Sequence, residues 1–501
     1  MASKLSKEVD LGHEPVGRLL FRLAVPAITS QIVNVLYNMV DRMYIGHIKD
    51  VGATALTGVG VTFPLIMIIS AFAALMGMGG APRASILMGK KDSEGAERIL
   101  GNCFSALFLT SIVLTILVLL FQEPLLMMFG ASENTIGYAT DYMRIYALGT
   151  IFVQMTLGLN NFISAQGFSK ISMLTVIIGA ATNIVLDPVF IFGFNMGVSG
   201  AALATIISQA ISAVWAIRFL SGKTTILKLK KKNFRIQPSI LLPCIALGVA
   251  PFIMQATESI LTLCFNSSLL KYGGDLAVGA MTILSSVMQF ALLPLQGLTQ
   301  GGQPIISYNY GANNADRVKK AFKLVLISCL TYSALLWALT ELFPQIFVAI
   351  FTSDPELTEL TCWALRIYMA GVLVFGAQIA CQQTFIAFGN SKVSAFLAMF
   401  RKIIVLIPLI YILPIFLEDQ VMAVFLAEPI ADVVAVLTTV TLFSLNFRKL
   451  LRSMRDQKQS NSILTDYFPT PALKNTFFIL LHKYPASVQT AERMPDLSVS
   501  V

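Results

Sequence analysis

The chain has 501 residues, 56% of them hydrophobic and 13% charged, with a mean hydropathy of +0.74 and a formal net charge of +9. This composition excludes a soluble globular domain, because so few charged side chains cannot cover a protein surface in water. Basic loops beside anionic lipid head groups account for the positive charge, so it gives no reason to expect nucleic-acid binding.

Twelve apolar stretches, each long enough to cross a bilayer, follow one another along the chain. An open strand could not satisfy its backbone hydrogen bonds in lipid, so all twelve are read as helices. The sequence therefore predicts an all-α integral membrane protein. The predicted spans are residues 18–45, 54–82, 96–121, 138–165, 170–193, 197–220, 239–270, 276–307, 315–341, 359–388, 392–416 and 419–446.

The loops between these spans alternate in charge. The connection 122–137 has two Glu residues and neither Lys nor Arg, whereas the even-numbered connections and the end of the last span are basic. Because Lys and Arg are retained on the cytoplasmic side, both termini are predicted to be cytoplasmic. The first 17 residues are polar and the first apolar block is too long for a signal peptide, so no cleavable signal is expected. The basic loop residues are Lys90, Lys91, Lys223, Lys228, Lys230, Lys231, Lys232, Arg235, Arg317, Lys319, Lys320, Lys323, Arg448, Lys449, Arg452 and Arg455.

Two features carry no predicted chemistry. The cysteines lie in or beside spans without metal-ligand spacing, and we interpret them as small apolar residues. After about Leu451 the chain becomes polar, and its apolar patch from Phe477 to Leu481 is far too short to span. This tail is expected to be disordered or bound to a surface. The cysteines are Cys103, Cys244, Cys264, Cys329, Cys362 and Cys381.

The chain matches itself at an offset of 222 residues, which indicates two copies of a six-span unit. With an even number of spans each, the copies share one orientation and are related by an axis along the membrane normal. Two such bundles across a cleft are typical of a carrier that rocks, although duplicated bundles also form channels or membrane enzymes. The matched segments are Gly79 to Pro82 with Gly301 to Pro304, Ser85 with Ser307, Gly89 with Gly311, Arg144 to Tyr146 with Arg366 to Tyr368, Gly149 with Gly371, and Gly167 to Ser172 with Gly389 to Ser394.

This duplication gives the expected domain organisation. The regions are a cytoplasmic N-terminus (1–17), a first lobe of six spans (18–220), a basic cytoplasmic linker (221–238), a second lobe of six spans (239–446) and a cytoplasmic C-terminal tail (447–501).

Acidic side chains inside spans are costly in lipid and usually face a cavity or a partner, so each is a candidate functional group. Asp41 lies about five residues before the outer end of the first span, Asp187 about seven before that of the fifth, and Thr205 about eight into the sixth. At about 1.5 Å per helical residue, all three reach a depth of roughly 7–15 Å below the outer surface. Three spans are therefore predicted to place oxygen ligands in one layer.

Asn183 joins this layer, because it lies four residues before Asp187 on the same helix face. Pro188 has no N–H to donate to the carbonyl four residues earlier, which leaves an acceptor beside the carboxylate. These groups suit a hard cation such as Na⁺, or a proton shared between the two acids. The alternative is structural: Asp41 pairs with Arg42, and the fifth-span residues satisfy a break in the helix.

The second half lacks this set and has a different group of acids. Glu258 lies near mid-depth of the seventh span, while Glu428 and Asp432 share one face of the twelfth. Three interpretations remain open at this point: a second ion site, counter-charges for a cationic substrate, and buried partners for Arg401 and Lys402.

Proline inside a helix removes one hydrogen bond and makes a bend available. Pro26 shares the first span with Asp41, so ion binding could bias its bend, and we interpret it as a gating kink. Met, Phe and Gln inside the spans suit a cavity that repacks around ligands, although any lipid-facing surface also carries Phe and Met. On this basis Gln255 and Gln289 are candidate cavity residues.

Several of these segments resemble the multidrug and toxic compound extrusion (MATE) transporters, in particular a MepA-like bacterial branch. The likeness covers about residues 10–450. It rests on the segment Pro26 to Gly46 with Tyr37, Asn38 and Asp41, on Leu56 to Gly60 with Pro64, on Gly79 to Pro82, on Asn183 to Pro188 and on Gly197 to Ala202.

The resemblance implies a two-lobed antiporter in the bacterial inner (plasma) membrane. Such a protein expels drugs, often lipophilic cations, in exchange for H⁺ or Na⁺, needs no cofactor, and is expected to be a monomer. This chain lacks the tenth-helix acid that some relatives carry, because its own tenth span offers only glutamines. In the family, the ion-coupling positions match Asp41, Asn183, Asp187 and Thr205, and neighbouring cavity positions match Tyr37 and Asn160. Glu258 matches an acid in the seventh helix of those relatives that carry the tenth-helix acid, and is a further candidate cavity residue.

Three other functions compete with efflux. A flippase for lipid-linked sugars needs cationic side chains in its central cavity. The cations inside the spans of this chain are few, mainly Arg401 and Lys402, which disfavours a flippase. An intramembrane aspartyl protease needs two acids sharing a water, usually with a Gly-x-Gly-Asp turn, and the stretch ending at Asp275 lacks the first glycine. The loop 89–97 lacks the signature of the major facilitator transporters. The sequence therefore predicts a transporter and not an enzyme.

Overall fold

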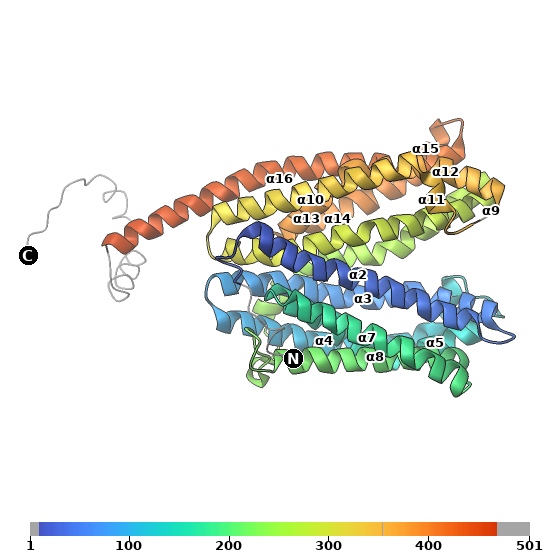
Figure 1. Ribbon diagram of the computed structural model, residues 1–501, viewed down its shortest axis with the longest axis horizontal. Helices are drawn as coiled ribbons and strands as arrows, with labels where there is room; N and C mark the ends of the chain where they lie inside the picture. Colours follow the sequence, from blue (N-terminus) through green and yellow to red (C-terminus); the bar gives the residue numbers. More distant parts are fainter. Residues whose placement is uncertain (1–9, 353, 468–501) are drawn as a thin grey trace, which may run out of the picture.

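The computed structural model describes residues 10–352 and 354–467, with side chains described as far as Gln457. All regular structure in these ranges is helical, and no strand occurs among them. Figure 1 shows two layers of helices, one from α2 to α8 and the other from α9 to α16. We call them the first bundle and the second bundle.

The helices divide between the two bundles in chain order. The first bundle contains α2 (Val16–Gly46), α3 (Gly52–Gly89), α4 (Ser93–Met128), α5 (Ile136–Leu148), α6 (Thr150–Ala165), α7 (Ser169–Pro188), the π-helical turn η1 (Val189–Gly193) and α8 (Gly197–Leu220). A linker with the 3-10 turn η2 (Lys231–Asn233) follows. The second bundle contains α9 (Pro238–Gly311), α10 (Ala315–Leu342), α11 (Pro344–Val348), α12 (Pro355–Met369), α13 (Val372–Ala387), α14 (Ser391–Met399), the π-helix η3 (Phe400–Leu406), α15 (Ile407–Phe416) and α16 (Gln420–Tyr467).

The described residues cross a membrane twelve times, as predicted. Nine helices are long and apolar enough to span, and α12 with α13 forms one more span bent by 45°. With 74 residues, α9 would be about 110 Å long if straight, several times the bilayer thickness. Gly274, with φ 65° and ψ −162°, breaks it into two crossings. The helices α5 and α6, separated only at Gly149, form the remaining span.

Of the two expectations for the tail, binding to a surface stays a prediction, and disorder is wrong for residues 451–467. There α16 continues without interruption as far as Tyr467. No Gly or Pro occurs between Pro429 and Pro469, so the sequence contains nothing that would stop the helix earlier. The patch from Phe477 to Leu481 lies outside the described residues.

The start of α2 packs on the second bundle instead of the first. Leu19, Leu23 and Ala24 share a buried cluster with residues of α9, α10 and α13. The chain just before α2 is also held there, because Arg317 donates to the carbonyls of Leu11 at 3.1 Å and of Glu14 at 2.8 Å.

The start of α9 packs, in turn, on the first bundle. Cys244 belongs to a buried cluster of α3, α4 and α6 residues. The linker before it is fastened to α4, where the Gln237 N–H donates to Asn102 Oδ1 at 2.6 Å and the Ser105 hydroxyl donates to the Phe234 carbonyl at 2.7 Å. Each bundle therefore holds the beginning of the other bundle's first helix.

The bundles meet most closely at the end that carries the start of α2 and the C-terminal part of α16, which we call the termini end (Figure 1). A Cβ on Gly89 of α3 would overlap the carbonyl oxygen of Tyr308, and a Cβ on Gly311 of α9 would overlap that of Ile86. The repeat offset of 222 relates Gly89 to Gly311 and Ile86 to Tyr308. One contact is thus made twice, symmetrically, around the axis between the bundles.

The buried carboxylate of Glu97 should be the strongest anchor of the linker. It is 5% exposed, accepts from the Lys228 N–H at 3.2 Å and pairs with Lys230 at 2.5 Å. Glu97→Ala leaves that N–H without its acceptor, so we expect a loss of about 1–2 kcal/mol of stability, measured by thermal unfolding in detergent. Glu94→Ala is the control, because its pairs with Arg98 and with Lys232 of the linker are both exposed, and it should unfold with the wild type. Equal losses from both would contradict the assignment.

Candidate functional site

The ends of three helices of the first bundle bring together the four residues predicted to hold an ion. Asp41 lies five residues before the end of α2, and Asp187 lies next to the end of α7, where the π-helical turn η1 begins. Thr205 lies eight residues into α8. All three helix ends are on the side opposite the termini end (Figure 1). The predicted layer therefore exists in the structure, and we call Asp41, Asn183, Asp187 and Thr205 the oxygen cluster.

Contacts within the oxygen cluster are direct. The Asn183 amide donates to Asp187 Oδ1 at 3.1 Å and to Thr205 Oγ1 at 3.4 Å. The carboxyl groups of Asp41 and Asp187 lie within hydrogen-bonding reach of each other. Asp41 is 7% exposed and Asp187 is 0% exposed.

Three oxygens of this cluster are buried without a hydrogen-bond donor among the described residues: Asp41 Oδ1, Asn183 Oδ1 and Asp187 Oδ2. Buried acceptors without a donor are costly, and two carboxylates in contact repel each other. A proton between the acids, or a desolvated cation on the three oxygens, would relieve both costs. The arrangement is thus suited to take up and release one positive charge.

Arg42 does not neutralise Asp41 by an ion pair in the described part of the chain. Its guanidinium lies over the ring of Phe63, 5.3 Å from the centroid. Neighbouring residues on a helix point in different directions, which explains the separation. The structural alternative for Asp41, pairing with Arg42, is therefore not what the structure contains.

Two residues near the cluster were missed by sequence reasoning. The Tyr142 hydroxyl of α5 interacts with Thr205, and Gln209 of α8 interacts with the Tyr37 hydroxyl. Gln209 lies four residues after Thr205, so helical spacing could have identified it. Its Oε1 is also buried without a partner among the described side chains. Tyr37 itself lies one turn before Asp41, as predicted.

The other predicted residues lie apart from the oxygen cluster. Asn160 of α6 donates to the carbonyl of Ser172, which is about 22 Å along α7 from Asp187. Gln255 is half-buried on the first half of α9, and Gln289 is exposed on its second half. Pro26 is buried within α2, and the helix continues on both sides of it without a break.

The acids of the second bundle are paired with cations. Arg401 binds Glu428 at 2.7 Å and Asp432 at 2.6 Å, and it lies 4.6 Å from the centroid of the Phe375 ring. Lys402 pairs with Glu258 and donates to the carbonyl of Met254 at 2.7 Å. Of the three interpretations left open by the sequence, partnership with Arg401 and Lys402 is present in the structure. We call these five charged residues the paired-charge cluster.

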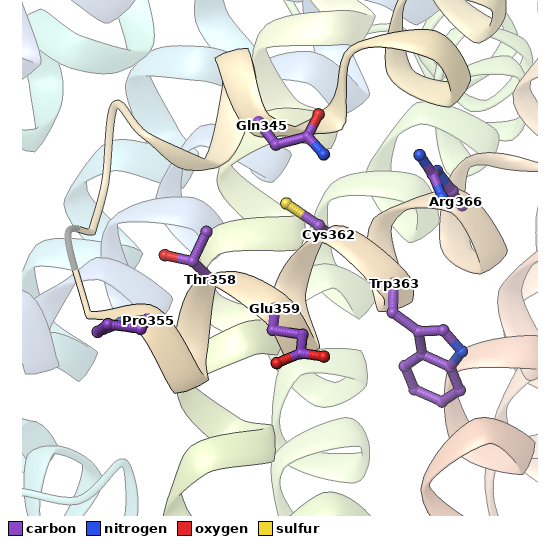
Figure 2. Close-up of a pocket in the computed structure, with 7 residues that line it drawn as sticks. All are labelled: Gln345, Pro355, Thr358, Glu359, Cys362, Trp363 and Arg366. Atoms are coloured by element: carbon purple, nitrogen blue, oxygen red, sulfur yellow. The ribbon is translucent and has the colours of Figure 1, made fainter.

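A surface pocket of about 610 Å³ lies at the start of α12, away from both clusters. Figure 2 shows that its side chains do not converge: Glu359 and Trp363 point to one side of α12, while Cys362 and Gln345 lie on the other. It carries none of the predicted site residues. No group of three or more metal-ligating side chains occurs in the part of the chain that the structure describes.

Comparison with known proteins finds a matching family model and curated relatives. The family model described as MatE matches residues 26–189 and again residues 251–412, once in each bundle. The "Multidrug export protein MepA" of Staphylococcus haemolyticus (strain JCSC1435) is 26% identical over 79% of this chain and 86% of its own length. That of Staphylococcus aureus (strain NCTC 8325 / PS 47) is 25% identical over 80% and 87%.

Solved structures share the fold. A "MATE in the bent conformation" superimposes with a TM-score of 0.82 at 22% identity, covering 90% of this chain and 98% of the other. An "outward-facing conformation of a multidrug resistance MATE family transporter" gives 0.83 at 23% identity, covering 89% and 98%. The predicted fold class, twelve helices in two related six-helix bundles, is confirmed.

Proposed function

Because the chain belongs to the MatE family, we propose that it is a secondary active efflux transporter that exports lipophilic, often cationic, small molecules in exchange for H⁺ or Na⁺. Members of this family are transporters, so the chain is a multi-pass membrane protein and not an enzyme. We further propose that the chain lies in the bacterial inner membrane as a monomer with both termini in the cytoplasm.

One observation carries the coupling proposal: two acids in contact and the asparagine beside them each have a buried oxygen without a donor among the described residues. Asp41, Asn183, Asp187 and Thr205 bind the coupling ion, which neutralises the pair. Without the ion, the repulsion between the acids pushes α2 away from α7. Pro26 then provides the bend, because its missing N–H removes one backbone hydrogen bond from α2.

Substrate binds between the bundles, and Tyr37, Asn160, Gln255, Glu258 and Gln289 are the proposed contacts. The symmetric contact of Gly89 and Gly311 closes the termini end. Release of the contact opens the termini end, which completes alternating access. The flippase alternative is less well supported, since Arg401 and Lys402 are buried and paired instead of free for a sugar phosphate.

Proteoliposomes containing the full chain test this function directly. We expect tetraphenylphosphonium to move against its own gradient when an opposing H⁺ or Na⁺ gradient is imposed, and to equilibrate only when neither is present. A response to the Na⁺ gradient at constant pH identifies Na⁺ as the coupling ion, and a response to the pH gradient in Na⁺-free buffer identifies H⁺. Empty liposomes are the control. Absence of uphill movement under both gradients would contradict coupled efflux.

A further inference from the structure

The paired-charge cluster of the second bundle contains an imbalance of charge. Its carboxylates are Glu258, Glu428 and Asp432, and its cations are Arg401 and Lys402, so three negative charges face two positive ones. Asp432 is 0% exposed, and its Oδ2 has no hydrogen-bond partner among the described residues. With all three carboxylates ionised, the cluster carries one negative charge in excess.

The two members of one pair differ strongly in access. The Lys402 side chain is 5% exposed, whereas that of Glu258 is 60% exposed. A ligand approaching the protein can reach the carboxylate but not the ammonium group. Glu258 is thus an accessible carboxylate that forms an ion pair with a buried lysine on its protein-facing side.

Both cations lie on the π-helix η3, whose consecutive residues point in different directions. Arg401 and Lys402, consecutive in sequence, contact two different neighbours: Arg401 is held by α16, and Lys402 by α9. A π-helix inserts an extra residue into the helical turn and is frequent at functional sites. With Arg401 fixed by two acids, Lys402 is held close to Glu258.

Lys402 can release Glu258 without becoming an unpaired buried charge. It keeps its bond to the Met254 carbonyl at 2.7 Å, and it lies within electrostatic range of Asp432. The excess negative charge of the Arg401 group then balances it.

We propose that Lys402 determines the charge specificity of transport: it occupies on Glu258 the place that the cationic group of a monovalent lipophilic substrate takes. This inference rests on the proposed efflux function and adds its substrate class. One incoming positive charge balances the three carboxylates against three cations, so a monocation fits. A neutral molecule gains nothing from the exchange, and its binding does not depend on Lys402.

Binding of tetraphenylphosphonium and of the neutral triphenylphosphine oxide to the purified full chain tests the proposal. Lys402→Gln removes the competing charge but keeps a donor, and should tighten tetraphenylphosphonium binding by about tenfold. Glu258→Gln should weaken it by about tenfold, and Lys402→Gln should have no effect in that background. Triphenylphosphine oxide should bind all variants equally. Lys230→Gln, which removes a cation from the distant pair with Glu97, is the matched control and should change neither affinity.

Lys402→Arg is a second variant that keeps the charge and the fold. Its guanidinium holds a carboxylate with two bonds, so it should weaken tetraphenylphosphonium binding. If the wild type binds and transports the cation but both Lys402 variants bind it with wild-type affinity, the inference is wrong and the efflux function stands. If both probes respond equally to Lys402→Gln, the residue is structural. If the wild type does not transport the cation, the efflux function itself fails.

Discussion

Asp41→Asn and Asp187→Asn should each lower ion-driven efflux by about 100-fold, corresponding to about 2.7 kcal/mol. An asparagine neither carries an exchangeable proton nor brings negative charge to a cation, so the remaining acid no longer needs an ion. The measurement is uphill tetraphenylphosphonium transport in proteoliposomes at saturating ion gradient. Asp141→Asn, an exposed acid of α5 in the same bundle, is the control and should transport at the wild-type rate.

Substrate binding separates coupling from other defects. Both variants should still bind tetraphenylphosphonium in detergent, because the oxygen cluster lies within the first bundle and the paired-charge cluster within the second. Uphill transport at wild-type rates by both variants would remove the oxygen cluster from the mechanism. Loss of binding together with transport would assign Asp41 and Asp187 to the substrate instead.

Asn183→Ala should distinguish the two possible ions. The amide contributes one of the three unpartnered oxygens, Asn183 Oδ1. A bound Na⁺ would lose that ligand, and its half-saturating concentration should rise by about tenfold, whereas the half-saturating proton concentration should not rise, because the amide donates to the charged carboxylate of Asp187. A half-saturating ion concentration that does not rise in this variant would therefore favour H⁺.

Gly89→Ala and Gly311→Ala should have the second large effect, because each added Cβ would overlap a backbone carbonyl that cannot move away as a side chain could. The termini end then cannot close, and we expect transport to fall below a tenth of the wild-type rate. Spin labels at the exposed, repeat-related positions 94 and 316 should report a longer distance in both variants. The consequence is a protein held open at the termini end.

Gly60→Ala on the same helix α3 is the matched control, because a Cβ there would meet nothing within 4 Å. It should leave transport and the spin-label distance unchanged. Wild-type label distances and wild-type transport in both Gly89→Ala and Gly311→Ala would show that the tight contact is not required for closure.

The sequence predicts the crossings and the oxygen cluster well for one physical reason: both depend on counting residues along helices. Hydrophobic length sets the spans, and equal depth brings Asp41 and Asp187 into one layer. The same logic fails where packing between distant segments decides. A helical period shows neither that Arg401 contacts α16 and Lys402 contacts α9 nor that Tyr142 lies near Thr205.

Two helix ends also could not be predicted from the sequence. Gly149 divides one predicted span, although glycine is common inside membrane helices and gives no certain signal. The sequence does not predict the continuation of α16 beyond Leu451, because polar composition indicates disorder or surface binding. The residues that follow Leu451 nevertheless favour a helix once one has started.

The fastening of each first helix to the opposite bundle constrains how such a molecule can be assembled. A chain of half this length could form the same architecture only as a pair of copies, each lending the beginning of its first helix to the other, as in a domain-swapped dimer. Fusion of two such copies into one chain makes that exchange intramolecular. Separately synthesised halves should therefore be stable together and unstable alone, since each lacks a segment that fills the other's core.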